Sequence, residues 1–295
     1  MSVDTGTTLP AVVVAAVREG RRLTDAEVRS VAASHDILAL GALADDLRRA
    51  RHGAATGYVR VHVLPLASRD AWTAPPDTAA EVRITGAPSD ATALVPAVRA
   101  ARALAGTKAV RGFELADLWA LGGAALLAEL AAAGLNEVAT VEPGPDAPAQ
   151  VMAARAAGLG VRVVGCGAPV TDRASWLLVA RALVDAVGGI EAVAPLPREV
   201  DVTTPTTGFD DVRAVALTRL ALEGVPHVQV DWQRHGPKLA QVALTVGADD
   251  LDLVRADDDT SKGLRRAPLE EVTRNITAAA LVPVERTATF GRVSA

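Results

Sequence analysis

Cysteine is nearly missing from this chain, which has one, Cys166, in 295 residues. A single cysteine excludes an internal disulfide, and the first residues lack the charged and apolar regions of a secretory signal, so we expect a cytoplasmic protein. It also excludes any metal centre that takes several thiolates from one chain. Cys166 follows a valine-rich segment, VRVVG, and we interpret it as a small buried thiol.

The chain also lacks an excess of positive charge and a long apolar run. Thirty basic residues face 35 acidic ones, which gives a net charge of −5 and no basic field to attract nucleic acid. The apolar stretch Leu9 to Val17 is too short to cross a bilayer, and Glu129 interrupts the alanine-rich stretch from Leu118 to Gly134. We expect both stretches to be buried helix faces and predict no membrane insertion.

The local motifs of common enzyme classes are missing as well. The sequence contains no GxSxG elbow, no phosphate-binding GxxxxGK[ST], no HExxH and no Cys/His spacing typical of zinc. His52 and His235 are isolated in the sequence, so histidine ligands for a metal would have to come from distant strands. The sequence therefore names no catalytic residue and no metal ligand.

What the chain does contain is a regular alternation of short strands and helices. Each expected strand is rich in Val or Ile, and helical patterns with apolar residues three and four positions apart lie between them. The expected strands are Tyr58 to Leu66, Glu81 to Gly86, Ala109 to Phe113, Glu137 to Val141, Val161 to Gly165, Ala192 to Ala194, His227 to Val230 and Asp250 to Val254. Eight such units predict an α/β fold, a TIM-barrel-like (β/α)8 barrel over residues 58–295, with a helical segment, residues 1–57, packed on it.

Several stretches resemble one enzyme family. They are GRRLTDAEVRSVAASHDILALGALADDLRRARHG (Gly20 to Gly53), the strands EVRITG and KAVRGFEL, the segment VGGIEAVAPLP, the segment PHVQVDW with GPKLAQVAL and GADDLD, and PVERTATF near the end. In these stretches the chain resembles the radical S-adenosylmethionine enzymes of the futalosine route to menaquinone. Aminofutalosine synthase, dehypoxanthine futalosine cyclase and the deazaflavin-cofactor synthases belong to that group. The resemblance implies a radical-enzyme barrel.

One part of the family pattern is missing. After the first strand the family has a loop with CxxxCxxC, whose thiolates hold a [4Fe-4S] cluster, followed by a helix. Here the interval is ASRDAWTAPPDTAA, Ala67 to Ala80, which has no cysteine and too little room for a full helix. We therefore expect a barrel that is imperfect after its first strand, no iron-sulfur cluster or other cofactor, and no radical chemistry.

Candidate binding residues follow from the barrel, because ligands of such barrels bind at the carboxyl ends of the strands. The expected binding residues are His62, Arg111, Glu114, Glu142, Asp231, Gln233, Asp257 and Asp258. Glu114 matches a family glutamate but could equally cap the helix that follows it. Asp257 and Asp258 stand where the family has a Glu-Glu pair, although a solvated loop explains them as well.

Three functions remain open at this stage. The first is a cluster-less homologue that serves as a binding, scaffold or regulatory partner of an active paralogue in menaquinone biosynthesis. The second is a non-radical enzyme that uses acid/base residues at the barrel mouth on a futalosine-like or chorismate-derived molecule. The third is a carrier or sensor of a nucleoside-like small molecule. A homo-oligomer is compatible with all three.

Overall fold

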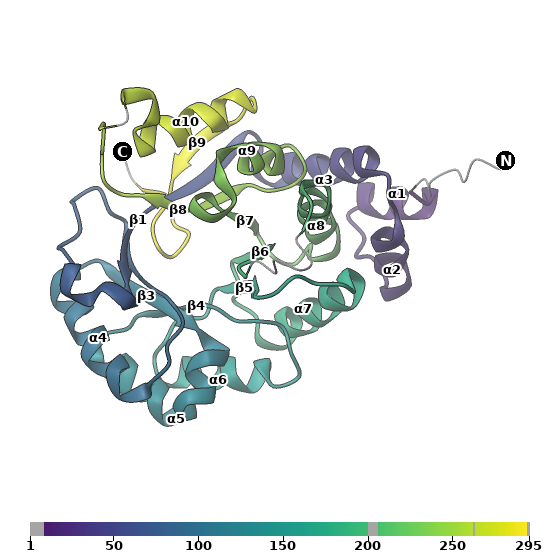
Figure 1. Cartoon of the computed structure of the whole chain (residues 1–295). Helices are drawn as coiled ribbons and strands as arrows, with labels where there is room; N and C mark the ends of the chain where they lie inside the picture. The colour runs from purple at the N-terminus through teal and green to yellow at the C-terminus, as the bar shows by residue number, and fades with distance from the viewer. Residues whose placement is uncertain (1–8, 200–205, 262, 294–295) are drawn as a thin grey trace.

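The computed structural model describes residues 9–199, 206–261 and 263–293, and it shows a parallel barrel surrounded by helices (Figure 1). Its strands are β1 (Ala55–Pro65), β2 (Glu81–Thr85), β3 (Ala109–Glu114), β4 (Glu137–Thr140), β5 (Val163–Cys166), β6 (Ala192–Pro197), β7 (His227–Asp231), β8 (Asp250–Arg255) and β9 (Val282–Glu285). The first eight correspond to the eight strands expected from the sequence, so the barrel fold is confirmed.

The strands pair in the order β4-β3-β2-β1-β8-β7-β6-β5, with every pair parallel. The two ends of this sheet meet through two single pairings, Glu137 with Gly160 and Val141 with Val164. The hydrogen bond from the Val141 amide to the Val163 carbonyl, 2.9 Å, is part of this contact. The barrel is therefore nearly closed, and β4 and β5 form its weakest pairing.

Helices cover the outside of the barrel. They are α4 (Ala91–Ala105), α5 (Leu115–Ala133), α6 (Ala147–Ala156), α7 (Arg173–Val187), α8 (Gly208–Ala221), α9 (Trp232–Leu244) and α10 (Pro268–Ala278). Most start at side-chain caps: Asp90, Asp172, Thr207 and Asp231 accept hydrogen bonds from the first turns of α4, α7, α8 and α9. The apolar core lies between these helices and the strands.

The N-terminal segment forms three helices, α1 (Ala11–Arg18), α2 (Asp25–Ala33) and α3 (Ile37–His52). Thr24 and Glu27 form a capping box at the start of α2. Helix α3 packs against α8, and α2 packs against α7, so the segment lies on one side of the barrel (Figure 1).

The interval after β1 is short, as the sequence predicts. A six-residue 3-10 helix, η1 (Leu66–Ala71), follows β1, whereas each of the strands from β2 to β7 is followed by an α-helix. Trp72 ends it, and the indole Nε1 donates to the Pro65 carbonyl at 2.8 Å. The barrel is thus imperfect at this one connection.

The alanine-rich stretch forms α5, which is kinked at Gly123. Within the described residues α5 is the one helix with the length and composition to cross a membrane, and the core helix of a soluble protein has the same properties. Five of its six leucines are buried, whereas several of its alanines are exposed. The expected buried face is therefore present, on one side of the helix.

Candidate ligand site at the barrel mouth

The inside of the barrel is polar, unlike the packed aliphatic interior common in TIM barrels. Charged or amide side chains alternate with apolar ones along three strands, so all of them face the same side. These are Glu81 and Arg83 on β2, Gln229 and Asp231 on β7, and Asp250 and Asp252 on β8. The apolar residues between them face the helices and form the core.

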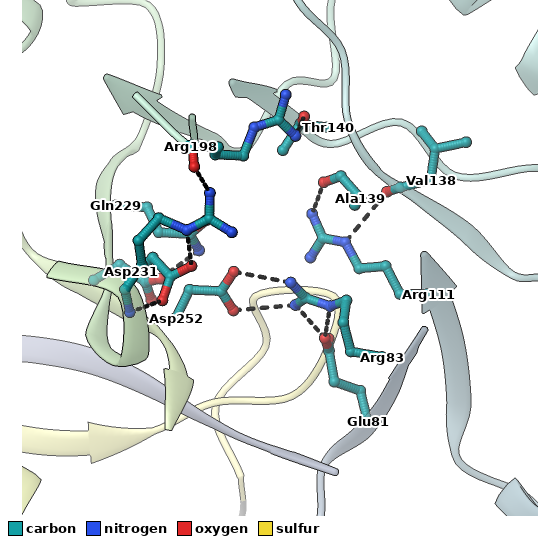
Figure 2. Close-up of polar contacts among 12 residues, drawn as sticks. Glu81, Arg83, Arg111, Val138, Ala139, Thr140, Arg198, Gln229, Asp231 and Asp252 are labelled. Carbon is teal, nitrogen blue, oxygen red and sulfur yellow. Dashed lines mark hydrogen bonds and ion pairs between the residues drawn. The ribbon is translucent and has the colours of Figure 1, made fainter. Parts of the chain in front are cut away.

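Arg83 is the centre of an ion network inside the barrel. Its guanidinium binds Asp252 through two hydrogen bonds of 3.1 Å and donates from Nε to Glu81 at 2.7 Å (Figure 2). Burial opposes ionisation of Asp252, but the charge of Arg83 outweighs it and holds the pKa of that carboxyl well below its usual range. Arg83 and Asp252 therefore form a charged pair at neutral pH.

A cavity of about 330 Å³ opens above this pair. It lies at the carboxyl ends of the strands, where barrels of this kind bind ligands. Its lining consists of Arg83, Ile84, Thr85, Gly86, Ala87, Phe113, Glu114, Asp117, Ala139, Thr140, Ala194, Leu196, Arg198, Glu199, Gln229, Asp231, Arg234, His235, Asp252 and Leu253.

Two lining residues have strained backbones. Phe113 has φ of 63° and Leu253 has φ of 55°, a region that residues with bulky side chains rarely adopt. Each such conformation costs on the order of 1–3 kcal/mol and persists where the surrounding structure enforces it, commonly at functional sites. The strain at the ends of β3 and β8 thus marks this cavity.

Asp231 and His235 form one wall of the cavity. Asp231 accepts a hydrogen bond from the Arg234 amide at 2.9 Å, and burial raises the pKa of its carboxyl. Burial, aided by the charge of Arg234, lowers the pKa of His235 to about 4, so its imidazole is neutral at pH 7. A carboxyl that protonates easily therefore lies near an imidazole that does not.

Glu114, Thr140 and Arg198 form the opposite wall. The Glu114 carboxylate contacts both the Thr140 hydroxyl and the Arg198 guanidinium, and Arg198 Nη1 donates to Thr140 Oγ1 at 2.8 Å. Burial, followed by repulsion from Arg234, lowers the pKa of Arg198 to about 10. The alternative role of Glu114 as a side-chain cap of α5 is not observed.

Arg111 lies immediately behind this wall and is 1% exposed. Its Nε donates to the Val138 carbonyl at 3.2 Å and its Nη2 to the Ala139 carbonyl at 2.7 Å (Figure 2). Burial, followed by repulsion from Arg83, lowers the pKa of Arg111.

The other expected binding residues lie away from the cavity. His62 Nε2 is 2.9 Å from the Thr73 carbonyl, and Glu142 accepts from the Gly167 amide at 3.2 Å. Gln233 lines a separate depression beside α9 and α10. Asp257 is 44% exposed and binds Arg255, and Asp258 is exposed, as a solvated loop would have them. Of the eight, Glu114 and Asp231 line the cavity and Arg111 is adjacent to it.

The sequence interpretation missed most of the lining. Arg83, Asp252 and Gln229 show a signal that was available, a polar residue at every second position of a strand. Arg198 and His235 lie in connections beyond β6 and β7, and no local pattern distinguishes them from surface residues. The tertiary structure alone places them at the cavity.

The residues present do not suit a [4Fe-4S] cluster held by three thiolates. The connection between β1 and β2, where the family pattern places these ligands, has no cysteine. Cys166 is at the end of β5, is buried, and donates from Sγ to the Ala168 carbonyl at 3.2 Å. Burial raises the pKa of this thiol, which disfavours the thiolate that a metal requires.

A second titratable cluster lies at the other end of the barrel. His52, His227 and Asp249 bring their ligand atoms within 4.8 Å of one another, although the two histidines are isolated in the sequence. His52 Nε2 is 2.9 Å from the Pro226 carbonyl, His227 Nδ1 is 2.6 Å from Asp249 Oδ2, and Arg219 binds Asp249. These bonds already use atoms that would bind a metal. We therefore interpret the cluster as one that stabilises the fold.

Comparisons with known proteins agree with this fold. No protein-family profile matches the chain. Aminodeoxyfutalosine synthase from Thermus thermophilus is 35% identical over 38% of this chain and 34% of its own length. Cyclic dehypoxanthine futalosine synthase from Streptomyces coelicolor is 30% identical over 45% of this chain and 37% of its own length. A 5-amino-6-(D-ribitylamino)uracil–L-tyrosine 4-hydroxyphenyl transferase from Methanosarcina barkeri is 33% identical over 40% of this chain and 36% of its own length. The aligned part thus spans about a third of these curated relatives.

Solved structures extend the likeness of the fold to nearly the whole chain. Methylornithine synthase superposes with a TM-score of 0.64 over 92% of this chain and 97% of its own, at 13% identity. The FeFe-hydrogenase maturase HydG from Carboxydothermus hydrogenoformans superposes with a TM-score of 0.64 over 95% of this chain and 80% of its own, at 12% identity. The chain is thus similar in sequence to the futalosine-route synthases and related radical S-adenosylmethionine enzymes, and it has the barrel fold of the radical enzymes.

Proposed function

We propose that this protein is a cluster-less homologue of the futalosine-route radical enzymes that binds a small polar molecule at its barrel mouth. In this role it acts as a binding or regulatory partner of an active paralogue in menaquinone biosynthesis, in the cytoplasm. The observation that supports the proposal has two parts: the barrel mouth has a cavity with a polar lining, and the connection between β1 and β2 contains no cysteine.

Two features support binding at the mouth. The lining is organised by paired charges, such as Arg83 with Asp252 and Glu114 with Arg198, that cost free energy to bury. The strained backbones of Phe113 and Leu253 add to this cost. Aliphatic residues in the interior would give a more stable barrel. Ligand binding is therefore the simplest explanation for the charged and strained lining.

Anaerobic reconstitution of the full chain with iron and sulfide tests the absence of a cluster. We expect the same low iron content in the wild-type protein and in Cys166→Ala, and no cleavage of S-adenosylmethionine. The Thermus thermophilus aminodeoxyfutalosine synthase, treated in parallel, serves as the positive control. About one cluster per chain that disappears in Cys166→Ala, together with cleavage, would show that the proposal is wrong.

The partner role needs a separate measurement. We expect the purified chain to bind a purified futalosine-route synthase or cyclase in analytical ultracentrifugation, and to change the rate of that enzyme. If no complex forms and the rate does not change at micromolar concentrations, the partner role is wrong. Small-molecule binding would then be tested alone.

A second candidate function is non-radical acid/base catalysis, and the contrast between Asp231 and His235 favours it. Two groups whose surroundings shift their pKa values in opposite senses can divide the roles of acid and base. Turnover of a futalosine-like molecule would then be lost in both Asp231→Asn and His235→Gln and kept in the solvent-exposed control Asp258→Asn. Equal turnover in all three variants would exclude this function.

A further inference from the structure

Two buried guanidinium nitrogens at the mouth have no hydrogen-bond partner in the described part of the chain. They are Arg111 Nη1 and Arg198 Nε. Arg111 also forms no ion pair with any carboxylate there, since its remaining nitrogens donate to two backbone carbonyls. A buried donor without a partner is unfavourable, and more so when the group is charged.

The nearby carboxylates are already in contact with arginines. Glu81 and Asp252 bind Arg83, and Glu114 binds Arg198. These three carboxylates balance the charges of Arg83, Arg198 and Arg111, and Glu81 and Asp252 act on Arg111 only through space. What Arg111 lacks is a direct partner for Nη1. Nη1 is buried and lacks a partner, so an acceptor that enters from the adjacent cavity would complete its hydrogen bonds, and the charge of the guanidinium favours an anionic acceptor.

Both arginines meet at the end of β4. Arg111 donates to the carbonyl of Ala139, and Arg198 donates to the hydroxyl of Thr140, the next residue in the chain. Figure 2 shows the two guanidinium groups approaching these residues from different sides of the barrel, with Arg83 and Asp252 below them. Ala139 and Thr140 both line the cavity, so a molecule in it lies beside both groups.

We propose that the cavity binds its small molecule through an oxyanion, a carboxylate or a phosphate, that accepts hydrogen bonds from Arg111 and Arg198. The inference rests on the proposed ligand binding at the mouth and names the chemical class of that ligand. Guanidinium groups suit this role because they present several N–H donors in a planar fork that matches both oxyanions.

Calorimetric titration of the full chain with matched pairs tests the inference. The probes are adenosine 5′-monophosphate against adenosine, and benzoate against benzamide, so that each pair differs in its charged group. We expect at least one anion to bind ten to a hundred times more tightly than its neutral analogue, because hydrogen bonds to charged groups contribute about 1.5–3 kcal/mol. The pair that shows the difference identifies phosphate or carboxylate as the group bound.

Arg111→Met should abolish this preference for the anion, and Arg111→Lys should retain part of it. The matched control is Arg155→Met, because Arg155 also binds backbone carbonyls, those of Val187, Val161 and Gly188, but lies outside the cavity. This control should keep the preference. If Arg111→Met does not fold, Arg198→Gln provides the same comparison.

Three results would overturn the inference: equal affinity for charged and neutral probes, unchanged anion binding in the Arg111 variants, or no binding of either anion at millimolar concentration. Failure of this kind leaves the iron and partner measurements unaffected, since neither depends on the charge of the ligand. A positive iron result with intact anion binding would instead reject the cluster-less proposal and keep the oxyanion site.

Discussion

At the scale of single residues, the polar barrel interior is the feature that sets this molecule apart from a packed TIM barrel. The alternation of polar and apolar residues on β2, β7 and β8 is visible in the sequence, and it predicts which side chains share a face. It does not show whether that face points into a barrel or towards solvent. Whether the polar face lies inside depends on closure of the sheet into a barrel, and the sequence of a single strand does not show closure.

Arg83→Met should destabilise the protein by about 3–5 kcal/mol, because it leaves the buried carboxylates of Glu81 and Asp252 without their cation. Urea denaturation measures this change. The control is Arg21→Met, which removes a pair with Glu27 on an arginine that is 42% exposed and should therefore cost far less stability than Arg83→Met. Similar losses in the two variants would contradict a charged network in the barrel.

Asp231→Asn should raise the melting temperature at pH 7 by at most a few degrees. Burial raises the pKa of Asp231, so the wild-type protein loses stability as pH rises through the range between the unfolded and folded values. Asparagine still caps α9 and does not ionise. Thermal melts from pH 3 to 8 should show the gain growing as pH increases.

Asp172→Asn is the matched control, because Asp172 caps α7 but is exposed. Hydrogen bonds from Ser175 lower the pKa of this carboxyl, so its contribution to stability is present above the unfolded value. The control variant should therefore lose stability at pH 7. If both substitutions changed stability in the same direction, burial would not be what distinguishes Asp231.

At the scale of elements, all eight barrel strands could be predicted from runs rich in Val and Ile, and the short connection after β1 from its two prolines and its length. The kink of α5 could not be placed, because Gly122 and Gly123 are adjacent and the alanine-rich sequence favours a continuous helix. The structure assigns the kink to Gly123, at φ of 57°. The four-residue strand β9 was also not predicted from the sequence.

Gly123→Ala should destabilise the protein by about 1–2 kcal/mol, because a side chain disfavours this left-handed conformation. There is open space around the position, so the cost comes from the backbone and not from a clash. Gly144→Ala is the control, since that glycine has open space and no positive φ. Chemical denaturation that shows equal effects in the two variants would argue against a fixed kink.

At the scale of the whole molecule, titratable clusters lie at both ends of the barrel, one beside the mouth cavity and one formed by His52, His227 and Asp249. Which end a cluster occupies follows from the direction of the strands: Asp231 and Asp252 fall late in their strands, whereas His227 begins β7 and Asp249 precedes β8. The sequence predicts His227 as the first residue of its strand, and the structure agrees. The sequence could not bring His52 to the same place, because that contact joins α3 to residues far along the chain.

His52→Gln and His227→Gln should change the pH dependence of stability in opposite directions. Burial lowers the pKa of His52, so its contribution is present above its unfolded value and is lost as pH falls. For His227, burial opposes protonation but the bond to Asp249 outweighs it and raises the pKa, so its contribution is present at low pH and is lost as pH rises. Melting temperatures between pH 5 and 8 measure the two slopes; slopes that change alike would contradict this arrangement.

Strand β1 has three neighbours, β2, β8 and β9, and two of these come from the last quarter of the chain. During synthesis on the ribosome, the edge of β1 that pairs with β8 therefore stays without hydrogen-bond partners until residues 250–255 have emerged. Unpaired edges of this kind are where nascent proteins associate wrongly, and contacts between distant residues fold slowly. Yield in a heterologous host should accordingly depend on growth temperature and chaperone supply more than on codon choice or promoter strength.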